Sequence, residues 1–89
     1  MLSTRKVTIQ NSQGMHARPA MQLVETSSRF RSTIAIRKGR QKVNAKSIME
    51  VMTLEAVEGT ELTLEAEGKD AQAAVEALVR LIAEKFNED

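Results

Sequence analysis

The stretch Glu61-Leu62-Thr63-Leu64-Glu65-Ala66-Glu67 alternates strictly between polar and apolar side chains. Because successive side chains of a β-strand point to opposite faces, this alternation predicts a strand with its leucines and alanine buried and its other face in water. Beyond it, Asp70 is suited to cap a long helix. Apolar residues then recur at helical spacing and form a wide stripe, which consists of Ala71, Ala74, Val75, Leu78, Leu81 and Ile82. A strand with one wet face followed by an amphipathic helix indicates a helix packed on one side of a sheet.

Toward the N-terminus the same two periodicities predict the remaining elements. The predicted strands cover residues 7–10, 33–37, 41–44 and 61–67, and the predicted helices cover residues 17–28, 47–54 and 71–82. Lys38-Gly39-Arg40 supplies a hairpin turn, so the second and third strands are expected to be antiparallel. Ser47 with Glu50 three positions later fits the capping box that starts a short helix.

The resulting order is βαββαβα in a chain of 89 residues, of which 42% are hydrophobic. A chain of this length buries roughly 60% of its unfolded surface and has room for one core. We therefore expect a single domain over residues 1–89. Its predicted class is α+β, a two-layer open-faced sandwich in which three helices cover one face of a four-stranded antiparallel sheet.

Features of composition point to the cytoplasm. The start, Met1-Leu2-Ser3-Thr4-Arg5-Lys6, leads into alternating residues and not into a continuous apolar run, which argues against a signal peptide or a membrane span. There is no cysteine, so neither a disulfide framework nor a thiolate zinc site is expected. We expect a cytoplasmic protein without membrane insertion.

Charge is distributed unevenly along the chain. The net charge is +1, but residues 1–46 carry +9 and residues 47–89 carry −8. A basic arm with an acidic tail occurs in nucleic-acid-binding proteins, but both halves carry regular hydrophobic patterns. We expect one fold with opposite charges on different sides, whose basic side could dock an acidic protein partner.

His16 is the only histidine, and Glu25 is the only acid before residue 50. An imidazole-rich metal site and a hydrolytic triad both need more groups than these, so neither a metal site nor a cofactor is expected. The notable motif is Gly14-Met15-His16-Ala17-Arg18-Pro19-Ala20, at the start of the first predicted helix.

The start of a helix is a ready site for an anion, because its first N–H groups lack internal acceptors and lie at the positive end of the helix dipole. Pro19 costs little in a first turn, and Arg18 adds a planar donor fork suited to phosphate oxygens. A neutral imidazole at His16 is a competent nucleophile. Together these residues describe a phosphoryl receptor; the alternative is a histidine that only caps the helix or lies on the surface.

The motif at residues 14–20 resembles the active-site motif of the HPr family of phosphocarriers, and the resemblance extends over essentially the whole chain. It includes Asn44-Ala45-Lys46-Ser47-Ile48-Met49, the order of strands and helices, and the final Ala-rich helix. It implies that His16 accepts phosphate on Nδ1 from phosphorylated enzyme I and passes it to a histidine of an EIIA domain. It further implies that Arg18 contacts the phosphoryl group and that the backbone amides of Ala17 and Arg18 stabilise it.

The resemblance also implies partners and a regulatory site. A carrier of this kind is a transfer partner that forms a phosphohistidine and not a stand-alone enzyme, and we expect a monomer. The apolar docking patch of the family corresponds to Met15, Ile48, Met49 and Met52, with the last three favoured as contacts. Ser47 matches the serine modified by HPr kinase/phosphorylase in some bacteria, where it signals to a transcriptional regulator. Glu50 replaces the glycine that is usual in that branch, and its charge would oppose a phosphoserine.

Three alternatives remain open from the sequence. The motif and the acidic ending Phe86-Asn87-Glu88-Asp89 also resemble NPr, the carrier of the nitrogen-related phosphotransferase branch, whereas the middle of the chain is more like the HPr of sugar uptake. A non-catalytic binding regulator on the same scaffold would have no use for His16 and Arg18. A nucleic-acid module is disfavoured because two phenylalanines, with no tyrosine or tryptophan, leave little for base stacking.

Overall fold

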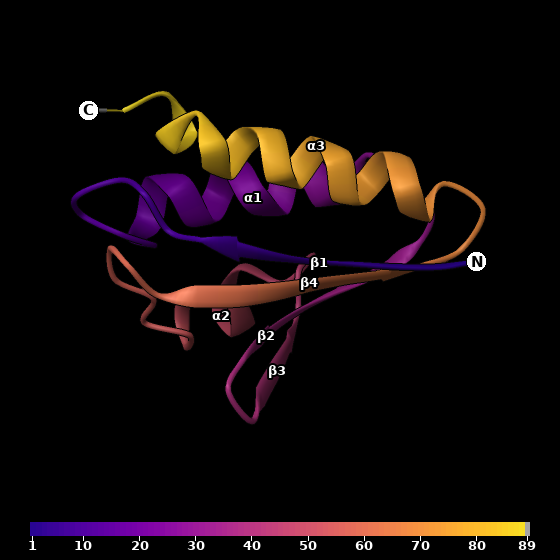
Figure 1. Ribbon diagram of the computed structural model, residues 1–89, viewed down its shortest axis with the longest axis horizontal. Coiled ribbons are helices and arrows are strands. Elements are labelled where there is room, and N and C mark those ends of the chain that lie inside the picture. The colour runs from indigo at the N-terminus through magenta and orange to yellow at the C-terminus, as the bar shows by residue number, and fades with distance from the viewer. Residues whose placement is uncertain (89) are drawn as a thin grey trace.

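Alternating strands and amphipathic helices assemble as expected in the computed structural model, which describes residues 1–88. The elements in order are β1 (Leu2–Thr8), α1 (Ala17–Ser28), β2 (Thr33–Lys38), β3 (Gln41–Asn44), α2 (Ile48–Met52), β4 (Glu61–Glu67), α3 (Ala71–Ala83) and a short turn, η1 (Lys85–Asn87). The predicted βαββαβα order and the two-layer α+β class are confirmed (Figure 1).

The sheet is wholly antiparallel, with strand order β1-β4-β2-β3. β4 lies between β1 and β2, and its Leu64 stands opposite Arg5 on one side and Ile36 on the other. Leu62, Leu64 and Ala66 are buried as their alternation predicted. Each buried leucine contributes about 1.5–3 kcal/mol relative to an exposed one. The buried face of β4 therefore lies at the centre of the core.

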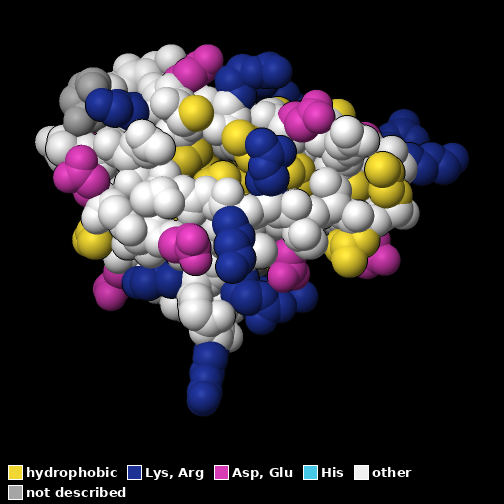
Figure 2. All heavy atoms as spheres, in the orientation of Figure 1, with side chains coloured by type: hydrophobic (Ala, Val, Ile, Leu, Met, Phe, Trp, Pro, Cys, Tyr) yellow, Lys and Arg dark blue, Asp and Glu magenta, His cyan; other side chains and the backbone are white. Residues whose placement is uncertain are grey.

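The helices α1 and α3 lie side by side across one face of the sheet (Figure 1). α1 buries Ala20 and Leu23 against the core, and α2 contacts α1 and β3. The predicted stripe of α3 is buried except for Leu81, which is half-buried. Apolar atoms remain visible along the seam between α3 and β1 (Figure 2). Among residues 1–88, no helix has the length and apolar character needed to cross a membrane.

The first strand differs from its predicted bounds of residues 7–10. β1 begins at Leu2 because it pairs with β4 along its whole length, from Leu2 opposite Glu67 to Thr8 opposite Glu61. Polar residues 3–6 are tolerated there because β1 is an edge strand, and pairing with β4 outweighs local alternation. Ile9 lies beyond the strand, is buried, and exchanges backbone hydrogen bonds with the segment before β4.

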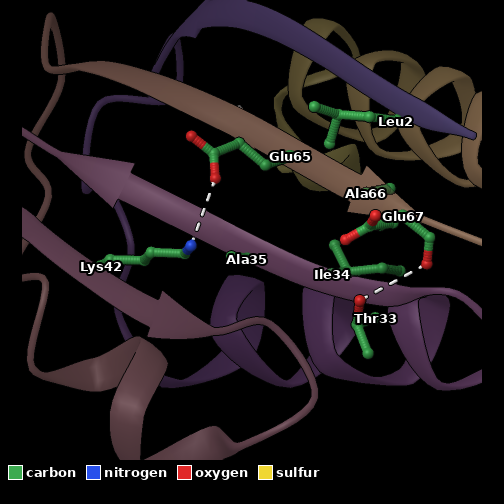
Figure 3. A pocket seen from close by; sticks show the side chains of 8 residues that line it. All are labelled: Leu2, Thr33, Ile34, Ala35, Lys42, Glu65, Ala66 and Glu67. Atoms are coloured by element: carbon green, nitrogen blue, oxygen red, sulfur yellow. Dashed lines mark hydrogen bonds and ion pairs between the residues drawn. The ribbon is translucent and has the colours of Figure 1, made fainter.

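The expected separation of opposite charges is wrong at the sheet. The acid-rich β4 lies between the basic strands β1 and β2, and on the open face Glu65 pairs with Arg37 (Nε–Oε2 3.1 Å) and Lys42 (Nζ–Oε1 3.6 Å). The hydrogen bond from the Arg37 guanidinium holds the pKa of Glu65 below its usual value. Figure 3 shows the Lys42–Glu65 pair on this face, and Figure 2 shows acids and bases interspersed.

Asp70 occupies the N-cap position of α3, but its side chain makes no cap hydrogen bond. Its carboxylate instead accepts from the backbone N–H groups of Arg31 (2.8 Å) and Ser32 (2.9 Å) and from the Ser32 hydroxyl. The predicted capping role is therefore replaced by a tie to the loop between α1 and β2. These hydrogen bonds, the Ser32 hydroxyl first, lower the pKa of Asp70 to about 2.

We expect Asp70→Asn to lower the free energy of unfolding at neutral pH and to flatten its dependence on acid. A carboxyl whose folded pKa is below its unfolded pKa stabilises the fold above the unfolded value of 3.8, and loses that contribution as the pH falls through about 2. Urea unfolding from pH 7 to pH 2 measures this, with Glu84→Gln as the control on an exposed acid at the opposite end of α3. Equal acid slopes for wild type and Asp70→Asn would contradict the prediction.

Candidate functional site

The start of α1 provides two free backbone donors beside an imidazole. His16 is the N-cap residue, with extended backbone (φ −81°, ψ −170°), and its side chain makes no cap hydrogen bond. Its carbonyl accepts from the N–H of Ala20 at 3.0 Å, and Pro19 has no N–H to satisfy. Among residues 1–88, no acceptor contacts the amides of Ala17 and Arg18. Those two amides are the donors an anion at His16 would use.

The loop before α1 is fixed by backbone contacts from a distant segment. Gly14 has a positive φ of 68°, and a Cβ at this position would lie 2.5 Å from the carbonyl oxygen of Ala56. The next residue, Met15, donates its N–H to that same oxygen at 2.7 Å. This glycine allows the loop to lie against the segment before β4, which sets the direction in which His16 leaves it.

The prediction that Met15 belongs to an exposed docking patch is wrong. Its relative exposure is 4%, and it packs within the core cluster. Its N–H donates to the carbonyl of the buried Ala56, so this part of the loop lies against the core. Sequence spacing placed Met15 near the histidine but could not show which way its side chain pointed.

The side chain of His16 borders an open hollow of about 480 Å³. The hollow is lined by Ser12, Gln13, His16, Ala17, Arg18 and Glu88. The imidazole is partly exposed, at 37%, and the Arg18 side chain is exposed. The ring is therefore accessible from solvent, in a hollow that Ala17 and Arg18 also line.

Glu88 is a member of this site that the sequence analysis did not single out. Its carboxylate oxygens lie 3.0 and 3.2 Å from Nε2 of His16. The two residues are 72 positions apart, so no local pattern connects them. The available signal was an apolar residue, Phe86, in a polar ending beyond the last helix, since a buried anchor there returns the chain to the core.

Asn11 links the loop to this carboxylate. Its side chain is fully buried, and its Nδ2 donates to the Gly14 carbonyl at 2.7 Å and to Oε1 of Glu88 at 2.8 Å. Both partners are acceptors, so the amide nitrogen and not its oxygen must face them. One buried amide thus holds both the glycine loop and the carboxylate that contacts His16.

Ser47 lies at the N-cap of α2, as its spacing predicted. Its Oγ accepts from the N–H of Glu50 at 3.3 Å. The reciprocal half of the capping box is absent, because the Glu50 carboxylate accepts from the N–H of Asn44 at 2.9 Å. The N–H of Ser47 donates to the Asn44 carbonyl instead. Glu50 therefore serves the end of β3 as well as α2.

Exposed apolar side chains gather on α2 and the neighbouring face of α1. Met49 is 79% exposed, and Ile48 and Met52 are exposed to lesser degrees. Met21 on α1, which the sequence analysis did not include, is 53% exposed and lines a small groove with Ile48. We refer to these four residues as the α1–α2 patch: Met21, Ile48, Met49 and Met52.

Within residues 1–88, no group of three or more metal-ligating side chains could hold an ion.

Comparison with known proteins identifies the family of this site. The family model described as "PTS HPr component phosphorylation site" matches residues 3–84. The chain belongs to the HPr family. HPr of Treponema pallidum is 46% identical over 85 residues, which cover 96% of this chain and 97% of that protein. This HPr-family chain is thus a phosphocarrier of the phosphotransferase system.

The chain is similar both to HPr and to NPr proteins. NPr of Proteus mirabilis is 36% identical over 90 residues and covers all of both chains. Among solved structures, HPr of Thermoanaerobacter tengcongensis superposes with a TM-score of 0.94, at 46% identity and with 98% of each chain covered. An HPr dimer from the same organism has a TM-score of 0.79 at 49% identity, covering 92% of this chain and 94% of that one.

Proposed function

We propose that phosphorylated enzyme I transfers its phosphoryl group to Nδ1 of His16, and that this carrier passes the group to a histidine of an EIIA domain. The observation that carries the proposal is the start of α1, where an accessible imidazole meets two free amides and the Arg18 side chain in one hollow. Phosphoryl transfer needs mainly in-line positioning and stabilisation of charge. The donors at the start of α1 could stabilise that charge, and the accessible ring leaves room for a donor to approach.

Each residue has a distinct role in the proposed step. The lone pair of Nδ1 forms the N–P bond while the bond to the donor breaks and its electron pair stays with the donor. The amides of Ala17 and Arg18 donate to the phosphoryl oxygens, and the positive end of α1 stabilises their charge. The Arg18 guanidinium supplies a planar donor fork to the same oxygens. Onward transfer reverses the sequence, with the electron pair returning to Nδ1.

The family implies interaction with phosphotransferase components such as enzyme I and EIIA. We propose the α1–α2 patch as their docking surface, because its methionines are exposed and their flexible thioethers can repack against different partners. α1 carries both His16 at its start and Met21 one turn further on. A partner that covers the patch therefore lies beside the phosphoryl group. We propose that the carrier does this in the cytoplasm as a monomer.

Similarity favours the sugar-uptake branch over the nitrogen-related branch, since identity to HPr of T. pallidum exceeds identity to the NPr sequence. Regulation through Ser47 by HPr kinase/phosphorylase, with signalling to a transcriptional regulator, is the second proposal. The partly exposed Ser47 at the start of α2 supports it, whereas the negative charge of Glu50, three positions on, would oppose a phosphate there. The relative rates of phosphoryl transfer to sugar-type and nitrogen-type EIIA proteins distinguish the branches.

The test is incubation of the chain with enzyme I and phosphoenolpyruvate, followed by measurement of the intact mass before and after acid treatment. One phosphoryl group that is lost in acid and stable in base is the expected result, because a phosphoramidate hydrolyses readily in acid and a phosphoserine does not. No gain in mass with several competent enzyme I proteins would overturn the transfer mechanism. The non-catalytic binding regulator would then be favoured.

A further inference from the structure

We propose that Glu88 is a positioning residue for phosphoryl transfer, one that holds the His16 ring with its proton on Nε2 and balances the charge that the ring gains. The inference rests on the proposed transfer through His16 and adds a residue outside the motif at residues 14–20. Its starting point is the contact of both Glu88 carboxylate oxygens with Nε2.

The chemistry of this contact determines where the proton lies. An ionised carboxylate is only an acceptor, so Nε2 must be the donor in the hydrogen bond. In a neutral imidazole the other nitrogen then carries the lone pair. Among residues 1–88, no partner occupies Nδ1 of His16. Glu88 therefore leaves the nucleophilic lone pair on the nitrogen that the transfer step uses.

The position of Glu88 is built into the fold. After α3 the backbone turns through three consecutive residues with positive φ, Lys85, Phe86 and Asn87. Such a conformation costs L-residues roughly 1–2 kcal/mol each and persists only where the surroundings enforce it. Burial of Phe86 holds the turn in this conformation, because this residue has a relative exposure of only 1%. The turn brings the next carboxylate back to the start of α1.

Asn11 fixes the carboxylate from its other side. The fully buried amide donates to Oε1 of Glu88 at 2.8 Å, and that oxygen is also the one nearest to Nε2. The carboxylate is thus held by a buried donor independent of His16, and its side chain is only 18% exposed. An exposed ion pair between mobile side chains would lack both constraints.

The charge on the ring changes during transfer, and Glu88 faces that change. When the Nδ1 lone pair bonds to phosphorus and the donor leaves with its electron pair, the ring keeps its Nε2 proton and becomes cationic. A carboxylate on Nε2–H stabilises this imidazolium, as the aspartate of a Ser-His-Asp triad does for its histidine. When the phosphoryl group moves on, the electron pair returns to Nδ1 and the ring is neutral again. No proton needs to leave or enter.

The experiment compares Glu88→Ala, Glu88→Gln and the control Glu84→Ala, which removes one exposed carboxylate from the same end of α3. Glu88→Ala is expected to slow single-turnover transfer from phosphorylated enzyme I about tenfold, the low end for loss of a hydrogen bond to a charged group. Its apparent KM should stay within about twofold of wild type, because the α1–α2 patch, the proposed docking surface, is unchanged. Glu84→Ala should match wild type in both constants.

A spectroscopic readout separates positioning from general damage. In ¹⁵N NMR of the unphosphorylated protein, wild type should show the proton on Nε2 and a slowly exchanging Nε2–H signal. Glu88→Gln keeps an acceptor oxygen but no charge, so it should retain that signal while transferring more slowly than wild type. Glu88→Ala should lose the signal.

The outcomes also distinguish this inference from the proposed function. If wild type takes up a phosphoryl group on His16 while Glu88→Ala transfers at the wild-type rate and keeps the Nε2–H signal, the role of Glu88 is overturned and the carrier function stands. If wild type takes up no phosphoryl group, the proposed transfer fails, and the NMR comparison still decides whether Glu88 orients the ring. Unchanged NMR signals in Glu88→Ala overturn the positioning role in either case.

Discussion

His16→Ala is expected to remain folded and to take up no phosphoryl group from enzyme I. The His16 side chain is partly exposed and makes no cap hydrogen bond, but its Nε2 contacts the Glu88 carboxylate, so its removal should lower the free energy of unfolding by no more than about 3 kcal/mol. The chain has no other histidine, so the acid-labile gain in mass should disappear entirely. Intact mass and circular dichroism on the same sample measure the two expectations.

Ser47→Ala is the matched control for this variant, because Ser47 is the other residue at which the family resemblance places a phosphate. It should take up the same acid-labile group as wild type and lose about 1 kcal/mol of stability with its helix cap. A folded His16→Ala protein that still gains a phosphoryl group would contradict the assignment of His16.

Gly14→Ala is expected to destabilise the protein by about 2–5 kcal/mol, from a left-handed conformation of an L-residue and a contact too close to relax easily. The added Cβ would meet backbone atoms, Ala56 O at 2.5 Å and Val57 Cα at 2.8 Å, and a backbone cannot rotate away as a side chain can. The shift would also strain the bond from the Met15 N–H to Ala56 and displace His16. Urea unfolding measures the loss, and the transfer rate of the folded fraction should fall with it.

Gly39→Ala supplies the control, because Gly39 also has a positive φ, 58°, but a Cβ there meets nothing within 4 Å. It should cost only the left-handed backbone, about 1–2 kcal/mol, and leave transfer unchanged. If Gly14→Ala proved no more destabilising than Gly39→Ala, the close approach to Ala56 would not limit the site.

Local patterns predicted the elements in which the spacing of apolar residues shows which side chains face the core. β3, β4 and the bounds of α1 follow the sequence prediction closely, because period-two and helical spacing reflect which side chains face the core. β1 was misplaced because an edge strand takes its register from its partner. Asp70 was assigned to its own helix, yet its carboxylate binds residues nearly forty positions earlier.

Some residues of the site could also be predicted from local sequence, and others could not. His16, Arg18 and the free amides were predictable, since a helix start exposes its donors whatever the rest of the chain does. The inward side chain of Met15, the exposure of Met21 and the contribution of Glu88 were not, because each depends on a segment distant in sequence.

Local patterns in the sequence were enough to predict the order of the elements, the class of the fold, the family, and the position of the histidine at the start of a helix. These features depend on the spacing of residues within one helical turn or one strand, and neighbouring residues in the sequence set that spacing. How His16 is held depends on contacts between segments that lie far apart in the chain. Burial of Asn11 and Phe86 brings the loop and the C-terminal turn together, and the Glu88 carboxylate meets Nε2 because the fold closes a separation of 72 residues.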